Sequence, residues 1–228
     1  MEDIPKHVGI ILDGNRRFAK RLMLEPWKGH EYGAKKIEEV LEWCKELSIK
    51  EITLFVFSLE NFNRPKEEFN YLMKVFNDGF ERLGKDERLD KYKIRVNVLG
   101  KIELFPKDVQ EKMKYIINKT KTYDDYILNF ALGYSGRAEI VDATKKIIEN
   151  KLKPEDITEG SFADYLYNKH DVDLIIRTSG EKRTSGFLLW QGSYAELVFV
   201  DKFWPEFTKE DFIDAIEEYS RRHRRFGK

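Results

Sequence analysis

The sequence contains very little cysteine. Its only cysteine is Cys44, so an intrachain disulfide and a cysteine-based metal cluster are both excluded. Such a composition is typical of a reducing compartment, and we expect a cytoplasmic protein. The N-terminus lacks a basic region followed by an apolar core, and no run approaches about 18 uninterrupted apolar residues. We therefore expect neither a signal peptide nor a membrane-spanning helix.

Net charge of one sign is also missing. Lys and Arg total 41, and Asp and Glu also total 41, so the formal net charge is zero. No global field attracts the chain to nucleic acid, so we expect no nucleic-acid partner, and any basic site must be local. Hydrophobic residues make up 41% of 228 positions, which is enough for a substantial core and favours a single domain over 1–228.

Short apolar runs alternate along the chain with stretches of helical period. The expected strands are 7–12, 51–57, 93–99, 126–132, 173–177 and 196–200. Between the first two strands, apolar residues repeat at helical spacing: Ile37, Val40, Leu41, Cys44 and Leu47. This alternation predicts an α/β fold, a single domain with a six-stranded, mostly parallel sheet flanked by helices.

Polar residues follow several strands at the point where each strand ends. "DGNRR" follows the first strand and "SLENFNR" the second. Arginines recur at these strand ends: Arg16, Arg17, Arg64, Arg137, Arg177 and Arg183. Because ligands collect at the carboxyl ends of parallel strands, we expect these side chains to form one site. The alternative is a solvated rim of ordinary turns, since Asp-Gly and Gly-Asn pairs are common in turns.

The residue types at this edge favour a phosphorylated ligand. Arginine binds phosphate oxygens in bidentate fashion, and Gly14 lets the backbone approach a ligand closely. Asp13 would repel a phosphate, so we expect Mg²⁺ between them, with Glu196 as a candidate second carboxylate. Neither a P-loop motif nor a dinucleotide fingerprint is present. A Mg²⁺-dependent phosphatase or phosphotransferase is one function that fits these residues.

The motifs of this chain are similar, in order and spacing, to those of the cis-prenyltransferases, which are undecaprenyl and dehydrodolichyl diphosphate synthases. They read "HVGIILDGNRRFAK", "GHEYGAKKIEEVLEWC", "TLFVFSLENFNRPKEEFNYLM", "DLIIRTSGEKRTSGFLLWQGSYAELVF" and "WPEF". "DGNRR" and "FSLENF" resemble the archaeal and eukaryotic branch more than the bacterial one. The resemblance implies an enzyme that adds isopentenyl diphosphate units in cis configuration to an allylic diphosphate primer, farnesyl or geranylgeranyl diphosphate, and releases diphosphate. It also implies a homodimer, and as product a polyprenyl diphosphate precursor of a glycosyl carrier lipid.

The resemblance assigns roles by position. Asp13 would hold Mg²⁺ and assist departure of the allylic diphosphate, Glu196 would be the second metal carboxylate, and Asn61 would help to remove a proton. The implied substrate-binding residues are Gly14, Asn15, Arg16, Arg17, Phe18, His30, Ser58, Leu59, Glu60, Phe62, Arg64, Arg177, Arg183, Thr184, Ser185, Arg225 and Gly227. The last two belong to a terminal Arg-x-Gly element that reaches a partner's diphosphate site. Without the resemblance, the basic end of the chain would also fit a nucleic-acid arm.

Three further expectations come with the resemblance. The helix carrying Phe69 to Phe80 would wall a hydrophobic tunnel for the growing chain, and product release would involve peripheral membrane contact. A phosphate-contacting arginine of the bacterial enzymes aligns with Pro26, and Arg16 or Lys28 would replace its charge. A non-catalytic subunit of a heteromeric synthase is an alternative. The presence of Asp13 argues against it, because such subunits typically lack this motif.

Overall fold

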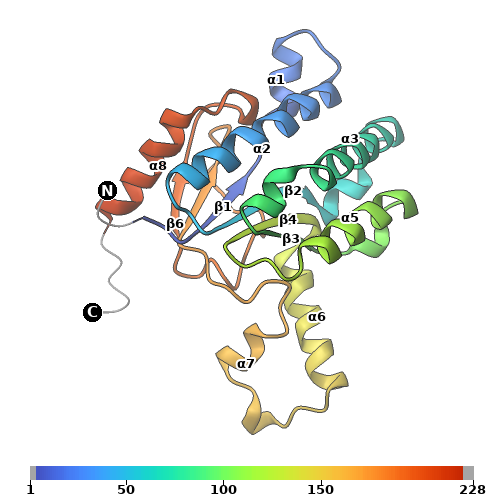
Figure 1. Cartoon of the computed structure of the whole chain (residues 1–228), viewed down its shortest axis with the longest axis vertical. Coiled ribbons are helices and arrows are strands. Elements are labelled where there is room, and N and C mark those ends of the chain that lie inside the picture. Colours follow the sequence, from blue (N-terminus) through green and yellow to red (C-terminus); the bar gives the residue numbers. More distant parts are fainter. Residues whose placement is uncertain (1–3, 223–228) are drawn as a thin grey trace.

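The computed structural model describes residues 4–222. Its sheet has six strands in the order β3-β4-β2-β1-β5-β6 (Figure 1). They are β1 (His7–Ile11), β2 (Glu51–Ser58), β3 (Ile94–Leu99), β4 (Tyr126–Tyr134), β5 (Leu174–Arg177) and β6 (Glu196–Phe199). All pairings between neighbouring strands are parallel, so the predicted sheet is confirmed. Every carboxyl end therefore meets at one edge.

The helices connect these strands and lie on both sides of the sheet. They are α1 (Asn15–Arg21), α2 (Gly29–Glu46), α3 (Lys66–Gly84), α4 (Glu87–Lys91), α5 (Lys107–Thr120), α6 (Gly136–Glu149), α7 (Glu159–Ala163) and α8 (Lys209–Arg221). Thr208 caps α8, since its hydroxyl accepts a hydrogen bond from the Asp211 amide. No helix in the described part of the chain is long and apolar enough to cross a bilayer.

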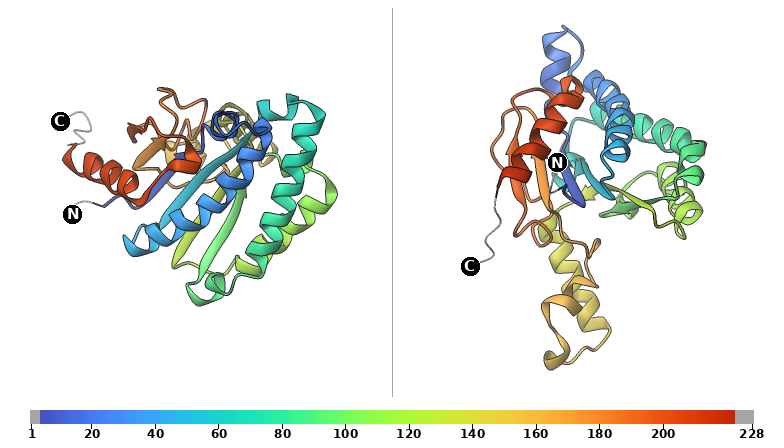
Figure 2. Two further views of the ribbon diagram at one scale, coloured as in Figure 1. Left: turned by 90° about the horizontal axis from the view of Figure 1, so that it is seen from above. Right: turned by 60° about the vertical axis from the view of Figure 1, so that its left-hand side comes forward.

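Alternation along β1 divides the core into two parts. Val8 and Ile10 face a large cluster that α2, α3, α5 and α8 complete. Ile11 faces a smaller cluster on the opposite side, which includes Phe187 and Leu188 from the segment after β5. The turn after α1 and the pair α6–α7 lie at opposite ends of the long axis of the molecule (Figures 1 and 2).

His7 is the first residue of β1 and is buried. One ring nitrogen lies 2.8 Å from the Thr53 hydroxyl, and the other lies 2.8 Å from the carbonyl oxygen of Asp171. Burial lowers the pKa of His7, although the carboxylate of Glu51 nearby opposes this shift. The imidazole is therefore neutral in the folded protein at neutral pH.

We predict that this histidine makes the fold sensitive to mild acid. An unfolded histidine takes up a proton near pH ~6.5, whereas His7 in the fold does so only at lower pH, so stability falls as pH drops below that value. The free energy of unfolding, measured by urea titration at about pH 7.5 and about pH 5.5, should fall more for the wild type than for His7→Gln, by up to about 1.4 kcal/mol per pH unit. An equal fall in the two proteins would contradict this assignment.

Candidate active site

Asp13 and Gly14 form the turn that ends β1. Gly14 has φ +102°, and a Cβ there would lie 2.8 Å from the ring of Phe203, so glycine is needed for both conformation and space. The Asp13 amide donates to the Thr178 hydroxyl at 3.0 Å, and its carbonyl oxygen accepts from the Trp204 amide at 2.9 Å. The backbone of Asp13 is thus fixed by two segments from the far end of the sequence.

The carboxylate of Asp13 pairs with Arg177 at the end of β5. Parallel register places Ile11 opposite Arg177, and the Arg177 Nη2 donates to Asp13 Oδ2 at 2.8 Å. The Nη1 atom donates to the Ser185 hydroxyl at 2.8 Å and to the carbonyl oxygen of Arg183 at 2.5 Å. The guanidinium is nearly buried, and its Nε is buried without a hydrogen-bond partner among residues 4–222. Asp13, Ser185 and the Arg183 carbonyl therefore hold Arg177 in place through its two terminal nitrogens.

A second arginine, Arg17, approaches the same carboxylate from α1. Its Nη2 lies 3.7 Å from Asp13 Oδ1 and also donates to the Ser179 hydroxyl, while its Nη1 lies 3.5 Å from Glu181. Glu181 also accepts a hydrogen bond from Arg183 at 2.5 Å. The structure therefore brings Asp13 and these arginines, predicted from the sequence, to one edge of the sheet.

The charge state of Asp13 follows from these neighbours. Burial alone would raise the pKa of the carboxyl group, but the hydrogen bond and positive charge of Arg177 outweigh burial and hold the pKa below its ordinary value. Asp13 is ionised at neutral pH. It is the kind of hard oxygen ligand that Mg²⁺ prefers.

A further charged cluster lies beside this turn and centres on a residue that our sequence analysis missed. Glu68, in α3, is 1% exposed and accepts a hydrogen bond from Arg64 at 2.9 Å. His30 Nε2 lies 3.2 Å from Arg64 Nη1, and Arg16 lies 3.5 Å from Glu68. Arg64 and Glu68 are four residues apart, which is the spacing of a helical ion pair and the only sequence signal for it.

The protonation states of this cluster are set by mutual contact. The His30 imidazole, 3.8 Å from the carboxylate, and the charges of Arg64 and Arg16 lower the pKa of Glu68 despite burial. Burial lowers the pKa of His30. At neutral pH the cluster therefore holds one carboxylate, one neutral imidazole and two guanidinium groups, and it carries net positive charge.

The motif after β2 forms a tight turn, η2 (Leu59–Asn63). The Ser58 amide donates to the side-chain oxygen of Asn61 at 3.1 Å, which fixes the orientation of that amide group. Phe62 packs against Phe57 and Phe105 with ring-centroid distances of 5.0 and 5.2 Å. Leu59 is half-buried and Glu60 is exposed. Phe62 therefore joins an aromatic cluster, while Asn61 stays at the sheet edge.

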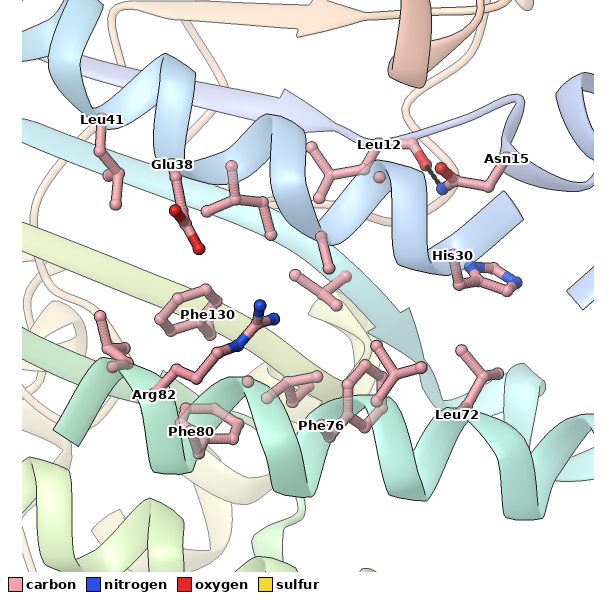
Figure 3. Close-up of a pocket in the computed structure, with 18 of the residues that line it drawn as sticks. Leu12, Asn15, His30, Glu38, Leu41, Leu72, Phe76, Phe80, Arg82 and Phe130 are labelled. Carbon is pink, nitrogen blue, oxygen red and sulfur yellow. Dashed lines mark hydrogen bonds between the residues drawn. The ribbon is translucent and has the colours of Figure 1, made fainter. Parts of the chain in front are cut away.

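An apolar pocket of about 510 Å³ lies between α2 and α3 and begins beside the charged residues (Figure 3). His30 and Asn15 line one end, and Glu38 and Arg82 lie further along it. Asn15 donates to the Leu12 carbonyl at 3.0 Å, but its Oδ1 is buried and has no hydrogen-bond partner in the described part of the chain. A Cβ on Gly33 would lie 2.3 Å from that oxygen. Gly33 thus makes room for Asn15.

Glu196 is not brought to Asp13 within the described chain. It begins β6 and pairs in register with Leu174, the first residue of β5, whereas Arg177 ends that strand. Three residues of strand rise correspond to about 10 Å, so Glu196 lies toward the opposite edge. Its carboxylate accepts a hydrogen bond from Arg222 at 2.9 Å. Its role as a metal ligand stays a prediction.

The remaining predicted residues are spread around the edge. The ring of Phe18 packs edge-on against Tyr32 at 5.3 Å, and the Thr184 carbonyl accepts from the Phe187 amide at 3.0 Å. Arg137 is exposed at the start of α6. Arg225 and Gly227 lie outside the described residues, so the terminal element and the homodimer stay predictions.

The residues present fit a magnesium ion only in part. Within residues 4–222, no group of three or more His, Cys, Asp and Glu side chains could hold a metal ion. A cation at Asp13 would therefore take its other ligands from diphosphate oxygens and water, which is the ligand set that Mg²⁺ accepts in phosphate-handling sites.

Comparison with known proteins agrees with this geometry. A family model for undecaprenyl diphosphate synthases matches residues 11–227. The tritrans,polycis-undecaprenyl-diphosphate synthase (geranylgeranyl-diphosphate specific) of Pyrococcus furiosus is 52% identical and covers 99% of this chain and 88% of its own. The enzyme of the same name from Thermococcus kodakarensis is 50% identical, and the match covers 99% of this chain and 88% of that enzyme.

A solved structure supports the same conclusion. Lavandulyl diphosphate synthase from Lavandula x intermedia, in complex with dimethylallyl diphosphate, superposes with a TM-score of 0.92 at 32% identity and covers 99% of both chains. Matches over nearly the full length leave no room for the phosphatase alternative. The chain belongs to the cis-prenyltransferase family, and it is an enzyme that adds isopentenyl diphosphate to an allylic diphosphate.

Proposed function

We propose that this enzyme extends geranylgeranyl diphosphate with isopentenyl diphosphate in a Mg²⁺-dependent reaction, and that its product is of undecaprenyl length. The observation that carries the proposal is the continuity between the charged edge at Asp13 and the apolar pocket between α2 and α3. An amphiphile with a diphosphate head and a prenyl tail matches both parts. The names of the archaeal relatives supply the primer and the product length.

The length of the pocket supports a primer of this size. Its lining runs along α3 from Leu72 to Leu83, which corresponds to about 16 Å of helix. An isoprene unit adds four main-chain carbons, or roughly 4–5 Å when extended, from carbon–carbon bonds of ~1.5 Å. The pocket thus has the length of three to four units, and geranylgeranyl has four. A longer product would extend past Leu41 and Leu83.

The side chains at the sheet edge would bind and orient the two diphosphates. When the allylic C–O bond breaks, its electron pair leaves with diphosphate, and the partly exposed guanidinium of Arg17 beside Asp13 would stabilise that charge. Mg²⁺ bound at Asp13 would supply further neutralisation of the leaving group. Asn61, oriented by the Ser58 amide, would position the carbon of isopentenyl diphosphate that loses its proton.

The cluster around Glu68 would serve as support for this chemistry. A buried carboxylate holds Arg64 and Arg16 in fixed positions beside the pocket entrance, so their charges need little reorganisation when a diphosphate binds. Its contact with Glu68 supports Arg16, more than Lys28, as the residue that would replace the arginine missing at Pro26. Neutral His30 fills the space between them without adding repulsion.

We predict that Asp13→Asn lowers condensation by at least about a hundredfold, because an ionised ligand at the leaving group is lost. The melting temperature should also fall, because the nearly buried Arg177 loses its counter-charge, so incorporation is compared at equal amounts of folded protein, checked by circular dichroism. Radiolabelled isopentenyl diphosphate incorporation measures the loss. The matched control is Asp125→Asn, an exposed aspartate before β4, which should retain full activity. Incorporation at the wild-type rate in Asp13→Asn would refute the role of this carboxylate.

The substrate proposal has its own test. Incorporation of isopentenyl diphosphate should require an allylic primer, be fastest with geranylgeranyl diphosphate, and stop when EDTA removes Mg²⁺. Farnesyl and dimethylallyl diphosphates serve as shorter primers in parallel reactions, and the products are sized by chromatography. Equal rates with all primers, or full activity in EDTA, would contradict the proposed primer or the metal requirement respectively.

We predict that Glu68→Gln raises the KM for the diphosphate substrates about tenfold, which corresponds to ~1.4 kcal/mol of binding. The substitution removes the charge that holds Arg64 and Arg16 but keeps the shape. Glu67→Gln is the matched control, because Glu67 is the exposed neighbour on the same helix. A larger effect of Glu67→Gln, or an unchanged KM in Glu68→Gln, would show that the buried carboxylate does not position these arginines.

A further inference from the structure

The turn after α1 exposes two apolar side chains at one end of the molecule. Met23 is 96% exposed and Leu22 is 45% exposed, while the rest of the turn is polar or half-buried. The turn lies at the end of the long axis, away from the other elements, in Figure 1 and in the right view of Figure 2. We call residues 20–28 the tip.

The backbone holds Met23 outward in an ordered way. Its amide donates to the Lys20 carbonyl at 3.0 Å, and the Leu24 amide donates to the Ala19 carbonyl at 2.9 Å, which is the Schellman pattern of a helix end. Met23 occupies the left-handed position of that pattern with φ +57°, where glycine is usual. A strained backbone that gains no packing for its side chain indicates a use for the side chain outside the fold.

The charges around these side chains complement an anionic surface. Lys20 and Lys28 are exposed, and neither forms an ion pair within the described residues. Arg21 is exposed and forms an ion pair with Glu206. Glu25 is the only acid among residues 20–28, so the tip combines exposed apolar groups with a cationic excess. This is the composition of segments that bind at a membrane interface.

We propose that the tip docks on an anionic lipid surface, with Leu22 and Met23 inserted among the acyl chains and Lys20 and Lys28 at the head groups. The tip is joined directly to the substrate pocket, because α1 runs from Asn15, which lines the pocket, to Arg21. Seven helical residues span about 10 Å. Docking in this way brings the pocket entrance close to the bilayer, where prenyl amphiphiles partition.

Vesicle sedimentation with the full chain tests this surface, without substrates, so its outcome is independent of the proposed primer and product. The wild type should bind vesicles of equal parts phosphatidylcholine and phosphatidylglycerol, and bind phosphatidylcholine alone more weakly. High salt should weaken binding because the lysine contribution is screened. Met23→Gly should bind at least tenfold more weakly. Its melting temperature should be unchanged or higher, since glycine relieves the left-handed strain.

The matched control is Val141→Ser with Ile148→Ser, which removes two exposed apolar side chains, 51% and 69% exposed, from α6. That variant should bind vesicles as the wild type does. Absence of wild-type binding, unchanged binding by Met23→Gly, or an equal loss in the α6 variant would each overturn the proposal. So would a change in self-association of Met23→Gly without vesicles, because the tip would then be a protein contact.

Discussion

The ion pair between Asp13 and Arg177 is the contact on which the site depends. A nearly buried guanidinium is tolerated only with a counter-charge and hydrogen-bond partners, and Asp13, Ser185 and the Arg183 carbonyl provide them. The same contact keeps Asp13 ionised. Arg177 ends β5 opposite Ile11, and Asp13 lies two residues beyond Ile11, so the register of the paired strands sets their separation. A diphosphate that enters this edge meets groups whose charge and position are already determined.

The charged cluster around Glu68 and the pocket between α2 and α3 lie next to this ion pair. Glu68 gathers Arg64, Arg16 and His30 at the pocket entrance, and beyond Asn15 most of the wall is apolar, with Glu38 and Arg82 further along it. Gly33 matters here because any larger residue would meet the Asn15 side chain. The positively charged entrance and the mostly apolar pocket therefore lie directly next to each other. A prenyl diphosphate has the same division between head and tail, so one orientation of the substrate is strongly favoured.

Most of the fold could be predicted from the sequence, because parallel strands buried on both faces appear as apolar runs, and the rule about their carboxyl ends correctly grouped Asp13 with Arg17 and Arg177. The same rule does not place Glu196 at that edge, because Glu196 begins its strand. Our sequence analysis chose it as a candidate second carboxylate for Mg²⁺ from its residue type, and the family resemblance repeated that expectation. Glu68 was missed because only apolar residues were used to predict the buried face of α3. Glu68 lies just before that apolar series and does not disturb its spacing. Its burial depends on His30 and Arg16 from distant segments, which no local pattern reveals.

The central position of β1 has a consequence for how the protein is made. Its partners are β2 and β5, and Val8 pairs with Leu174, far along the chain. During synthesis the first strand must wait for residues near the end before its second edge is covered. Asp13 meets Arg177 only at that stage, so the candidate site and the completed sheet form together. A chain truncated before β5 therefore contains the Asp13 motif but cannot form the site. Enzyme activity then requires the completed sheet.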